Sequence, residues 1–219
     1  MSVIATVYIP EGIIMAADSR VTGSFRHSDS KIIDRFTLSD NGQKVFLLAD
    51  KRVGISTCGE AEIGSQTIAD FIREFEIMHV SKEDTVETIA SHLLEFVHEK
   101  KKNASVRFHV AGYDGDEQRV FEVSDSVSRL NINNAYAASW SGDISHLTDL
   151  MNGKTPMIFD WNHMYLKDGI ELAEFMIDVN CKAQRFSLGV ATCGGPIDIL
   201  LITKDQARWV KHKILTDAA

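Results

Sequence analysis

A serine at position two and two charged residues at the end of an apolar strand are the residues of this chain most suited to chemistry. Ser2 begins a β-rich segment that leads into a turn, and Asp18 and Arg20 follow the apolar run 13–17. A solvated surface does not readily explain an acid and a base in this position, and functional side chains often lie at strand ends. The pattern indicates a functional site, with a purely structural pairing of Asp18 and Arg20 as the alternative.

Other motifs with a known chemistry are incomplete. The glycine-rich segment 189–195 lacks the Lys-Ser/Thr pair of a phosphate-binding loop, and segment 139–142 (SWSG) lacks the first glycine of a GxSxG nucleophile elbow. His92 and His98 are six residues apart on one predicted helix, so they do not share a face as metal ligands would. We therefore expect neither a metal site nor a cofactor.

The elements that position these residues follow from two hydrophobic periods. Alternation and β-branched residues predict strands over 3–9, 13–18, 44–48, 53–58, 106–113, 120–123, 136–140, 187–192 and 197–203. Apolar residues three and four positions apart predict helices over 61–75, 85–99, 144–151 and about 168–182. Segment 152–167 is expected to be a long connection, and the end of the chain a charged amphipathic tail. This order predicts an α+β fold of two packed sheets with helices outside.

Composition and charge limit the class of protein. The 219 residues are 44% hydrophobic and 25% charged, which is typical of a globular chain and excludes disorder, collagen and coiled coil. Acidic residues outnumber basic ones by 31 to 23, a net charge of −8, which argues against nucleic-acid and anionic-membrane partners.

The cysteines and the start of the chain indicate a compartment. Cys58, Cys181 and Cys193 have no spacing typical of a disulfide framework or a zinc knuckle. The sequence lacks a signal-peptide pattern and any run near the roughly 18 apolar residues that cross a bilayer. We therefore expect a soluble protein of the reducing cytoplasm. Cys193 is the weaker candidate for a nucleophile, because no histidine pattern supplies a base and a buried thiol is the simpler explanation.

Five segments carry a resemblance to a known family. They are 12–22 (GIIMAADSRVT), 44–45 (KV), 57–62 (TCGEAE), 139–142 (SWSG) and 193–198 (CGGPID). In this order they resemble the proteasome β-subunit family, including its bacterial member that works with an ATP-driven unfoldase. The first segment is fairly specific, and the others gain weight from their order. The resemblance implies an N-terminal-nucleophile (Ntn) hydrolase, with a single domain over 1–219 folded as a four-layer αββα sandwich.

The resemblance also assigns roles to individual residues. It places the nucleophile on Ser2, where the family usually has threonine, and the family's paired aspartate and lysine on Asp18 and Lys44. The glycine that binds the oxyanion falls on Gly59, one residue later than the family's spacing from the lysine. The serine that helps to position the terminal amine falls on Ser141.

Further positions concern the substrate pocket and the surroundings of the amine. Val21 and Thr57 match the pocket for the residue before the cleaved bond, and Arg20 and Cys193 would lie behind the catalytic residues. Two departures affect the network that holds the amine: Val190 replaces the family's aspartate, and Cys193 stands where serine is common. We expect slower or differently tuned chemistry as a result.

The implied activity is amide-bond hydrolysis by Ser2 after removal of Met1 by methionine aminopeptidase. The α-amine would act as the base for the hydroxyl, which is a poor nucleophile without one, and the Lys44 charge would favour the alkoxide-like form. Two alternatives stay open, a catalytically silent proteasome-like assembly subunit and an amidase of small non-peptide amides. The expected partners are a peptide or amide substrate and further copies of the chain in a ring or stacked homo-oligomer.

Overall fold

Residues 2–26, 33–48 and 50–214 are described by a computed structural model, and they form a mixed α+β fold with antiparallel sheets. The first five-stranded sheet has the spatial order β12 (Ala137–Gly142), β1 (Val3–Ile9), β2 (Gly12–Ala17), β13 (Asp198–Ile202) and β14 (Ala207–Lys211). The second has the order β11 (Val127–Arg129), β10 (Glu117–Val123), β9 (Val106–Asp114), β6 (Val53–Gly59) and β5 (Val45–Leu48).

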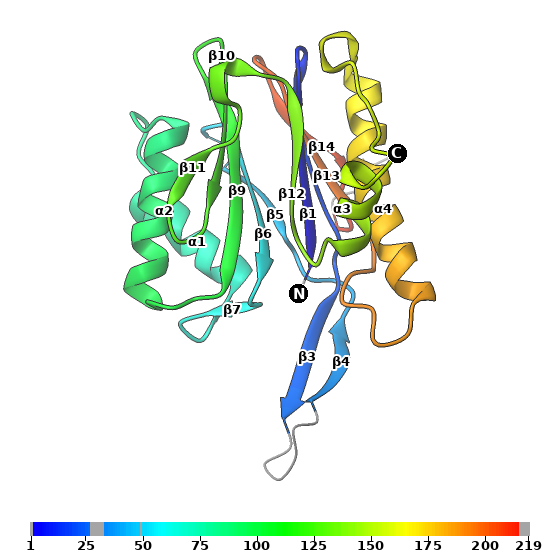
Figure 1. The fold of residues 1–219 in the computed structure, drawn as a ribbon. Helices are drawn as coiled ribbons and strands as arrows, with labels where there is room; N and C mark the ends of the chain where they lie inside the picture. Colours follow the sequence, from blue (N-terminus) through cyan, green and yellow to red (C-terminus); the bar gives the residue numbers. More distant parts are fainter. Residues whose placement is uncertain (1, 27–32, 49, 215–219) are drawn as a thin grey trace.

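Four α-helices occur within these described ranges, and Figure 1 shows them in pairs on two sides of the strands. They are α1 (Ile68–His79), α2 (Val86–Lys100), α3 (Ser145–Asn152) and α4 (Leu166–Phe186). Short 3-10 turns cover Ile132–Asn134 and Trp161–His163. Helix α2 begins where the Thr85 hydroxyl accepts the N–H of Thr88, a cap that satisfies one of the free donors of the first turn.

The hydrophobic core has three parts, which alternation along the strands keeps apart. On β1, Val3, Ala5, Val7 and Ile9 join a cluster with α3 and α4, whereas Ile4 and Tyr8 point to the opposite face. That face belongs to a second cluster, which combines side chains of both sheets. A third cluster lies between the second sheet and helices α1 and α2. Apolar faces on both sides of β1 explain why all seven of its residues are buried.

A hairpin of β3 (Val21–Arg26) and β4 (Ile33–Ser39) extends away from the two large sheets (Figure 1). The start of β1 lies at the end of the molecule from which this hairpin projects. Several apolar side chains of the hairpin are exposed, namely Phe25, Ile33, Phe36 and Leu38. A second, very short hairpin pairs β7 (Glu62–Ile63) with β8 (Gln66–Thr67).

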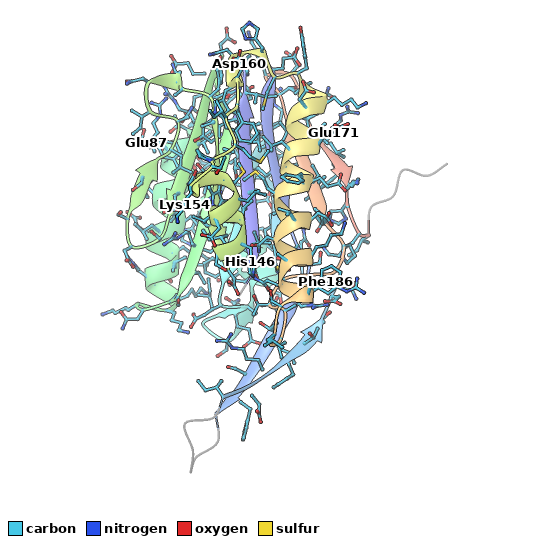
Figure 2. The ribbon with its side chains drawn as sticks, turned by 45° about the vertical axis from the view of Figure 1, so that its right-hand side comes forward. Glu87, His146, Lys154, Asp160, Glu171 and Phe186 are labelled. Carbon is cyan, nitrogen blue, oxygen red and sulfur yellow. The ribbon has the colours of Figure 1, made fainter. Side chains whose placement is uncertain are left out.

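Helix α4 runs along the first sheet, with Glu171 in its first half and Phe186 at its end (Figure 2). Phe186 lies at the end of α4 nearer the β3–β4 hairpin. Lys154 marks the connection that follows α3, and this connection reaches α4 without another long element, as expected. None of the described helices is long and apolar enough to cross a membrane.

The structure corrects four expectations about the elements. Segment 187–192 is not a strand, because the amide of Thr192 donates to the Gln184 side chain instead of a strand neighbour. Helix α1 begins at Ile68 instead of position 61, where Thr67 caps its first turn. The expected tail contains strand β14, which pairs with β13. The fourth expectation concerns an omission: strands β3 and β4 were not predicted.

Candidate functional site

Asp18 is the centre of a buried polar cluster at the end of β2. Its Oδ1 accepts hydrogen bonds from the Val3 amide at 3.0 Å and the Lys44 ammonium at 2.7 Å. Its Oδ2 accepts from the amides of Arg20 at 3.0 Å and Gly194 at 2.9 Å. The carboxylate is only 1% exposed, and these four donors compensate for its lost hydration. The side chain therefore fixes the start of β1, the turn after β2 and the 194 loop around one point.

Lys44 immediately precedes β5, and its ammonium reaches across to this cluster. Besides Asp18, its Nζ donates to the carbonyl oxygen of Arg20 at 2.6 Å. The Thr57 amide donates to the Lys44 carbonyl, which fastens the Lys44 backbone to β6. A lysine ammonium has three N–H donors, and described residues accept two of them. One donor and the positive charge are thus available to the neighbouring cavity, which Lys44 lines.

Ser2 immediately precedes β1 and lines the same cavity as Lys44. It is 6% exposed, and its carbonyl oxygen accepts the N–H of Asp143 at 2.8 Å, which extends the β1–β12 ladder by one residue. Gly142 makes this approach possible, because a Cβ at that position would lie 1.9 Å from the Ser2 carbonyl oxygen. The backbone of Ser2 is therefore held on both sides, by Asp143 and through Asp18 by its neighbour Val3.

A cavity of about 600 Å³ connects most of the predicted site residues. Ser2, Arg20, Val21, Lys44, Thr57 and Gly59 all line it. The remaining wall includes Ala61 together with Ile68 and Ala69 from the start of α1, so much of the lining is apolar. A volume of this size is typical of small-ligand sites. Residues from distant parts of the sequence thus line one largely apolar cavity, and the Lys44 ammonium lies at its edge.

Gly59 ends β6 and has a backbone conformation that disfavours other residues. Its φ is +112°, and a Cβ would lie 2.2 Å from the Ser105 carbonyl oxygen. The amide of the next residue, Glu60, donates to that same carbonyl at 3.0 Å. Glycine is therefore required where the strand turns along the cavity wall.

Ser141 points into the space between the two sheets and contacts side chains that the sequence did not single out. Its hydroxyl donates to Glu122 Oε2 at 3.1 Å and lies 3.1 Å from His109 Nε2. On the other side of the ring, His109 Nδ1 lies 2.9 Å from the Thr6 hydroxyl. His109 is fully buried, and this burial, with a further effect of Arg107, lowers its pKa to about 3. A histidine within the apolar stretch 106–111 was the available signal.

The alternative pairing of Asp18 with Arg20 is wrong for the side chains. The Arg20 guanidinium binds Asp40 through two hydrogen bonds of 2.7 and 2.9 Å, and only its backbone amide reaches Asp18. Hydrogen bonding to Asp40 raises the pKa of Arg20, and the same contact lowers the pKa of Asp40. A second contact ties the guanidinium to the Ala191 carbonyl at 3.4 Å. Arg20 therefore connects the cavity wall to Asp40 and the 191 loop.

Cys193 lies behind the cluster and is not part of the cavity wall. It is 1% exposed, and its Sγ accepts a hydrogen bond from Asn180 at 3.4 Å. Burial raises the pKa of Cys58, the cysteine that does line the cavity, to about 12, so its thiol stays protonated. Val190 is 45% exposed in the loop before Cys193. These contacts favour a structural role for Cys193.

The described part of the chain contains no cluster of metal-ligating side chains. No group of three or more histidine, cysteine, aspartate or glutamate side chains there could hold a metal ion. The cavity wall instead combines the Ser2 residue, the Lys44 ammonium and the backbone of Gly59.

Comparison with known proteins gives no assignment: no protein-family model matches this chain, and no curated protein sequence does.

Proposed function

We propose that this chain hydrolyses amide bonds, with Ser2 as the nucleophile and its own α-amine, exposed by removal of Met1, as the base. One observation carries the proposal: Ser2, Lys44 and Gly59 line the same cavity, and Asp18 holds the lysine in place. The order of the five segments that resemble proteasome β-subunits supports the same assignment. We infer a peptidase-like Ntn hydrolase, in which serine replaces the usual threonine.

The proposal includes the four-layer αββα sandwich of that family, in one domain over 1–219. The separation of the core into three clusters supports it, because one cluster combines both sheets and the others each join a sheet to two helices. In such an arrangement β1 is buried on both faces. Ser2, which immediately precedes β1, then lies at the edge of the space between the sheets, where a substrate can reach it.

Acylation begins when the Ser2 hydroxyl gives its proton to the α-amine, directly or through one water. An α-amine has a pKa of about 7.7–8.0, so a useful fraction is unprotonated at neutral pH. The oxygen attacks the carbonyl carbon, and the Gly59 N–H donates to the developing oxyanion, a contact worth about 3 kcal/mol. The ammonium then protonates the leaving nitrogen as the C–N bond breaks, which leaves an ester on Ser2.

Deacylation repeats these steps with water. The α-amine takes a proton from the water as its oxygen attacks the ester carbonyl, and the serine oxygen leaves and regains the proton. Throughout both steps the Lys44 ammonium favours the negatively charged oxygen and disfavours protonation of the nearby amine, through the same Coulomb interaction. Asp18 keeps that ammonium oriented through their 2.7 Å hydrogen bond.

Val21 and Thr57 are proposed to receive the side chain that precedes the cleaved bond. Both line the cavity, and Ile68 and Ala69 extend the same wall. The apolar character of this wall favours substrates with a medium-sized apolar side chain at that position.

The decisive experiment compares Ser2→Ala with the unaltered chain on peptide and acyl-amide substrates, with product release followed by mass spectrometry. We expect Ser2→Ala to lose hydrolysis by at least about 10³-fold, because the nucleophile is absent. Ser128→Ala, an exposed serine on β11, is the matched control and should keep full activity. Intact mass must show that Met1 has been removed; complete retention in the native cell would exclude Ser2 as the nucleophile.

The same experiment separates the alternatives. A chain that binds its own copies but hydrolyses nothing would be a silent assembly subunit, which the exposed Val190 in place of a carboxylate favours. Activity on small acyl-amides without activity on peptides would identify a non-peptide amidase.

We also propose that the chain forms a homo-oligomer, such as a ring or a stacked assembly. An isolated two-stranded hairpin is marginal in water, yet β3–β4 projects with Phe25, Phe36 and Leu38 exposed. A neighbouring copy would cover these side chains. Sedimentation velocity should give a mass well above 24.4 kDa, and a monomer at micromolar concentration would contradict the proposal.

A further inference from the structure

A chain of four polar side chains crosses the space between the two sheets behind the candidate site. Thr6 on β1 contacts His109 on β9, His109 contacts Ser141 on β12, and Ser141 contacts Glu122 on β10. The three contacts measure 2.9, 3.1 and 3.1 Å. Thr6, His109 and Ser141 are at most 1% exposed, so each hydrogen bond is made in a low-dielectric interior.

The proton of each hydrogen bond in this series of side chains can be placed from the chemistry of Glu122 and His109. An ionised carboxylate only accepts hydrogen bonds, so Ser141 uses its single proton on Glu122. The Ser141 oxygen must then accept from His109 Nε2, which carries the ring proton. Because His109 is neutral, its Nδ1 has no proton and accepts from the Thr6 hydroxyl. Glu122 thus sets the direction of every hydrogen bond in the chain.

Ser141 is also close to the start of β1. It pairs with Ile4 in the β1–β12 ladder, and Asp143 bonds to Ser2 in the same ladder. Side chains two residues apart on a strand share a face, so Ser141 is the diagonal neighbour of Ser2. With its proton committed to Glu122 and one lone pair used by His109, the Ser141 oxygen keeps one lone pair for a donor on Ser2.

We propose that Glu122 is a positioning residue. By accepting the Ser141 proton, it leaves the Ser141 oxygen as an acceptor for the α-amine of Ser2 and so stabilises the protonated form of that amine. This inference rests on the proposed function, since only a chain that begins at Ser2 has that amine. The ammonium arises when the amine takes the serine proton, and a fixed acceptor lowers the energy of that state. Glu122 thereby balances Lys44, which acts in the opposite direction.

Other titratable groups lie on the elements around the start of β1, and all remain present in the variants described below. They are Asp18 and Arg20 after β2, Lys44 before β5, Cys58 on β6, Arg107 on β9 and Asp143 after β12. Arg107 lies 3.6 Å from Glu122, with its side chain 48% exposed, so water screens much of its charge. Only Glu122 combines a carboxylate with a direct hydrogen bond to Ser141 in the described ranges.

The first test measures protonation states instead of turnover, and it uses protein whose chain begins at Ser2. Histidine imidazole ¹H–¹⁵N correlation spectra should show His109 protonated on Nε2 alone. The α-amine should be titrated through the signals of ¹³C-labelled serine. Glu122→Leu removes the acceptor with little change in volume, so we expect the amine pKa to fall by about one unit and Nδ1–H to appear on His109. Glu122→Gln keeps a carbonyl acceptor without the charge and should restore part of both effects.

The second test uses the pH dependence of kcat/KM. In Glu122→Leu the acidic limb should move to lower pH by about one unit, while kcat at the plateau falls about tenfold. In a Ser141→Ala background, Glu122→Leu should change kcat by less than about twofold, because its connection to the amine is already cut. Glu117→Gln, which removes an exposed carboxylate from the same strand, is the control and should match the unaltered chain.

The outcomes separate the two proposals. An amine pKa that is identical with and without Glu122, or His109 protonated on Nδ1 in the unaltered chain, overturns the positioning role even if Ser2→Ala abolishes hydrolysis. Equal effects of Glu122→Leu with and without Ser141 also overturn it. Should the chain hydrolyse nothing, the proposed function fails, and the amine titration still decides whether Glu122 acts on Ser2.

Discussion

Two ion pairs formed by residues 18–44 have similar geometry but very different surroundings. Lys44–Asp18 and Arg20–Asp40 both have closest N–O distances of 2.7 Å. The side chains of the first are 7% and 0% exposed, whereas those of the second are 22% and 42% exposed. Three backbone amides complete the coordination of Asp18, and Lys44 keeps one N–H for the cavity. The comparison teaches that two ion pairs with the same closest distance can differ greatly in burial, so the free energy lost when each is broken should differ as well.

Lys44→Met should produce the largest effect. It leaves Asp18 as a buried charge without its cation, and we expect the free energy of unfolding to fall by about 3–5 kcal/mol in urea denaturation. Lys101→Met removes a cation that pairs with Glu60 on the surface and should cost less than about 1 kcal/mol. Equal losses in the two variants would show that the burial of Lys44 does not matter.

Arg20→Met should have an intermediate effect. It removes two charge-assisted hydrogen bonds to Asp40, but water screens this pair, so we expect a loss of about 1 kcal/mol. The loss should shrink when the unfolding is repeated in 1 M salt, where the screening length is about 3 Å. A loss as large as that of Lys44→Met would contradict the distinction between the pairs.

The pH dependence of the exposed pair should be the smallest effect. Arg20 lowers the pKa of Asp40 below its ordinary 3.8, so the folded state binds this proton less readily than the unfolded state. The contribution of the Arg20–Asp40 pair to the free energy of unfolding is therefore complete above about pH 4 to 5. It disappears as the pH falls through the lowered pKa of Asp40. Urea midpoints at pH 6 and pH 3 should show Asp40→Asn losing less stability than the unaltered chain, by under 1 kcal/mol. An identical loss in both would mean that the pair contributes nothing.

Local patterns in the sequence were sufficient for the elements with strong periodicity. The β-branched and apolar runs of β1 and β2 on either side of the turn at 10–11, and the capped helix α2, follow from neighbours in the chain. The β3–β4 hairpin was missed because its exposed residues give no clear division into buried and polar faces. Segment 187–192 has a strand-like composition, but the amides at its two ends, of Ser187 and Thr192, donate to Gln184 instead of a sheet partner.

The residues of the candidate site also fall into two groups, those that the sequence indicated and those that it did not. Ser2, Asp18, Lys44 and Gly59 were named from a pattern of segments. In the structure Ser2, Lys44 and Gly59 line one cavity, and Asp18 lies behind its wall, bonded to Lys44. His109 and Glu122 gave no comparable signal, because each is a single polar residue in a strand whose role depends on what faces it from another sheet. No spacing along the chain relates Thr6, His109 and Glu122.

The sequence by itself determined which segments are strands or helices where the period is strong, and it supplied an acid at the end of a buried strand. The residues alone left Arg20 as a partner for that acid, and the family resemblance indicated Lys44. The tertiary structure shows that Asp18 binds the side chain of Lys44, whereas the Arg20 guanidinium binds Asp40. The physical reason is that successive side chains beyond a strand point in different directions, and burial then selects partners by position in space. The hydrogen-bond chain to Glu122 was decided in the same way, because it exists only where the two sheets meet.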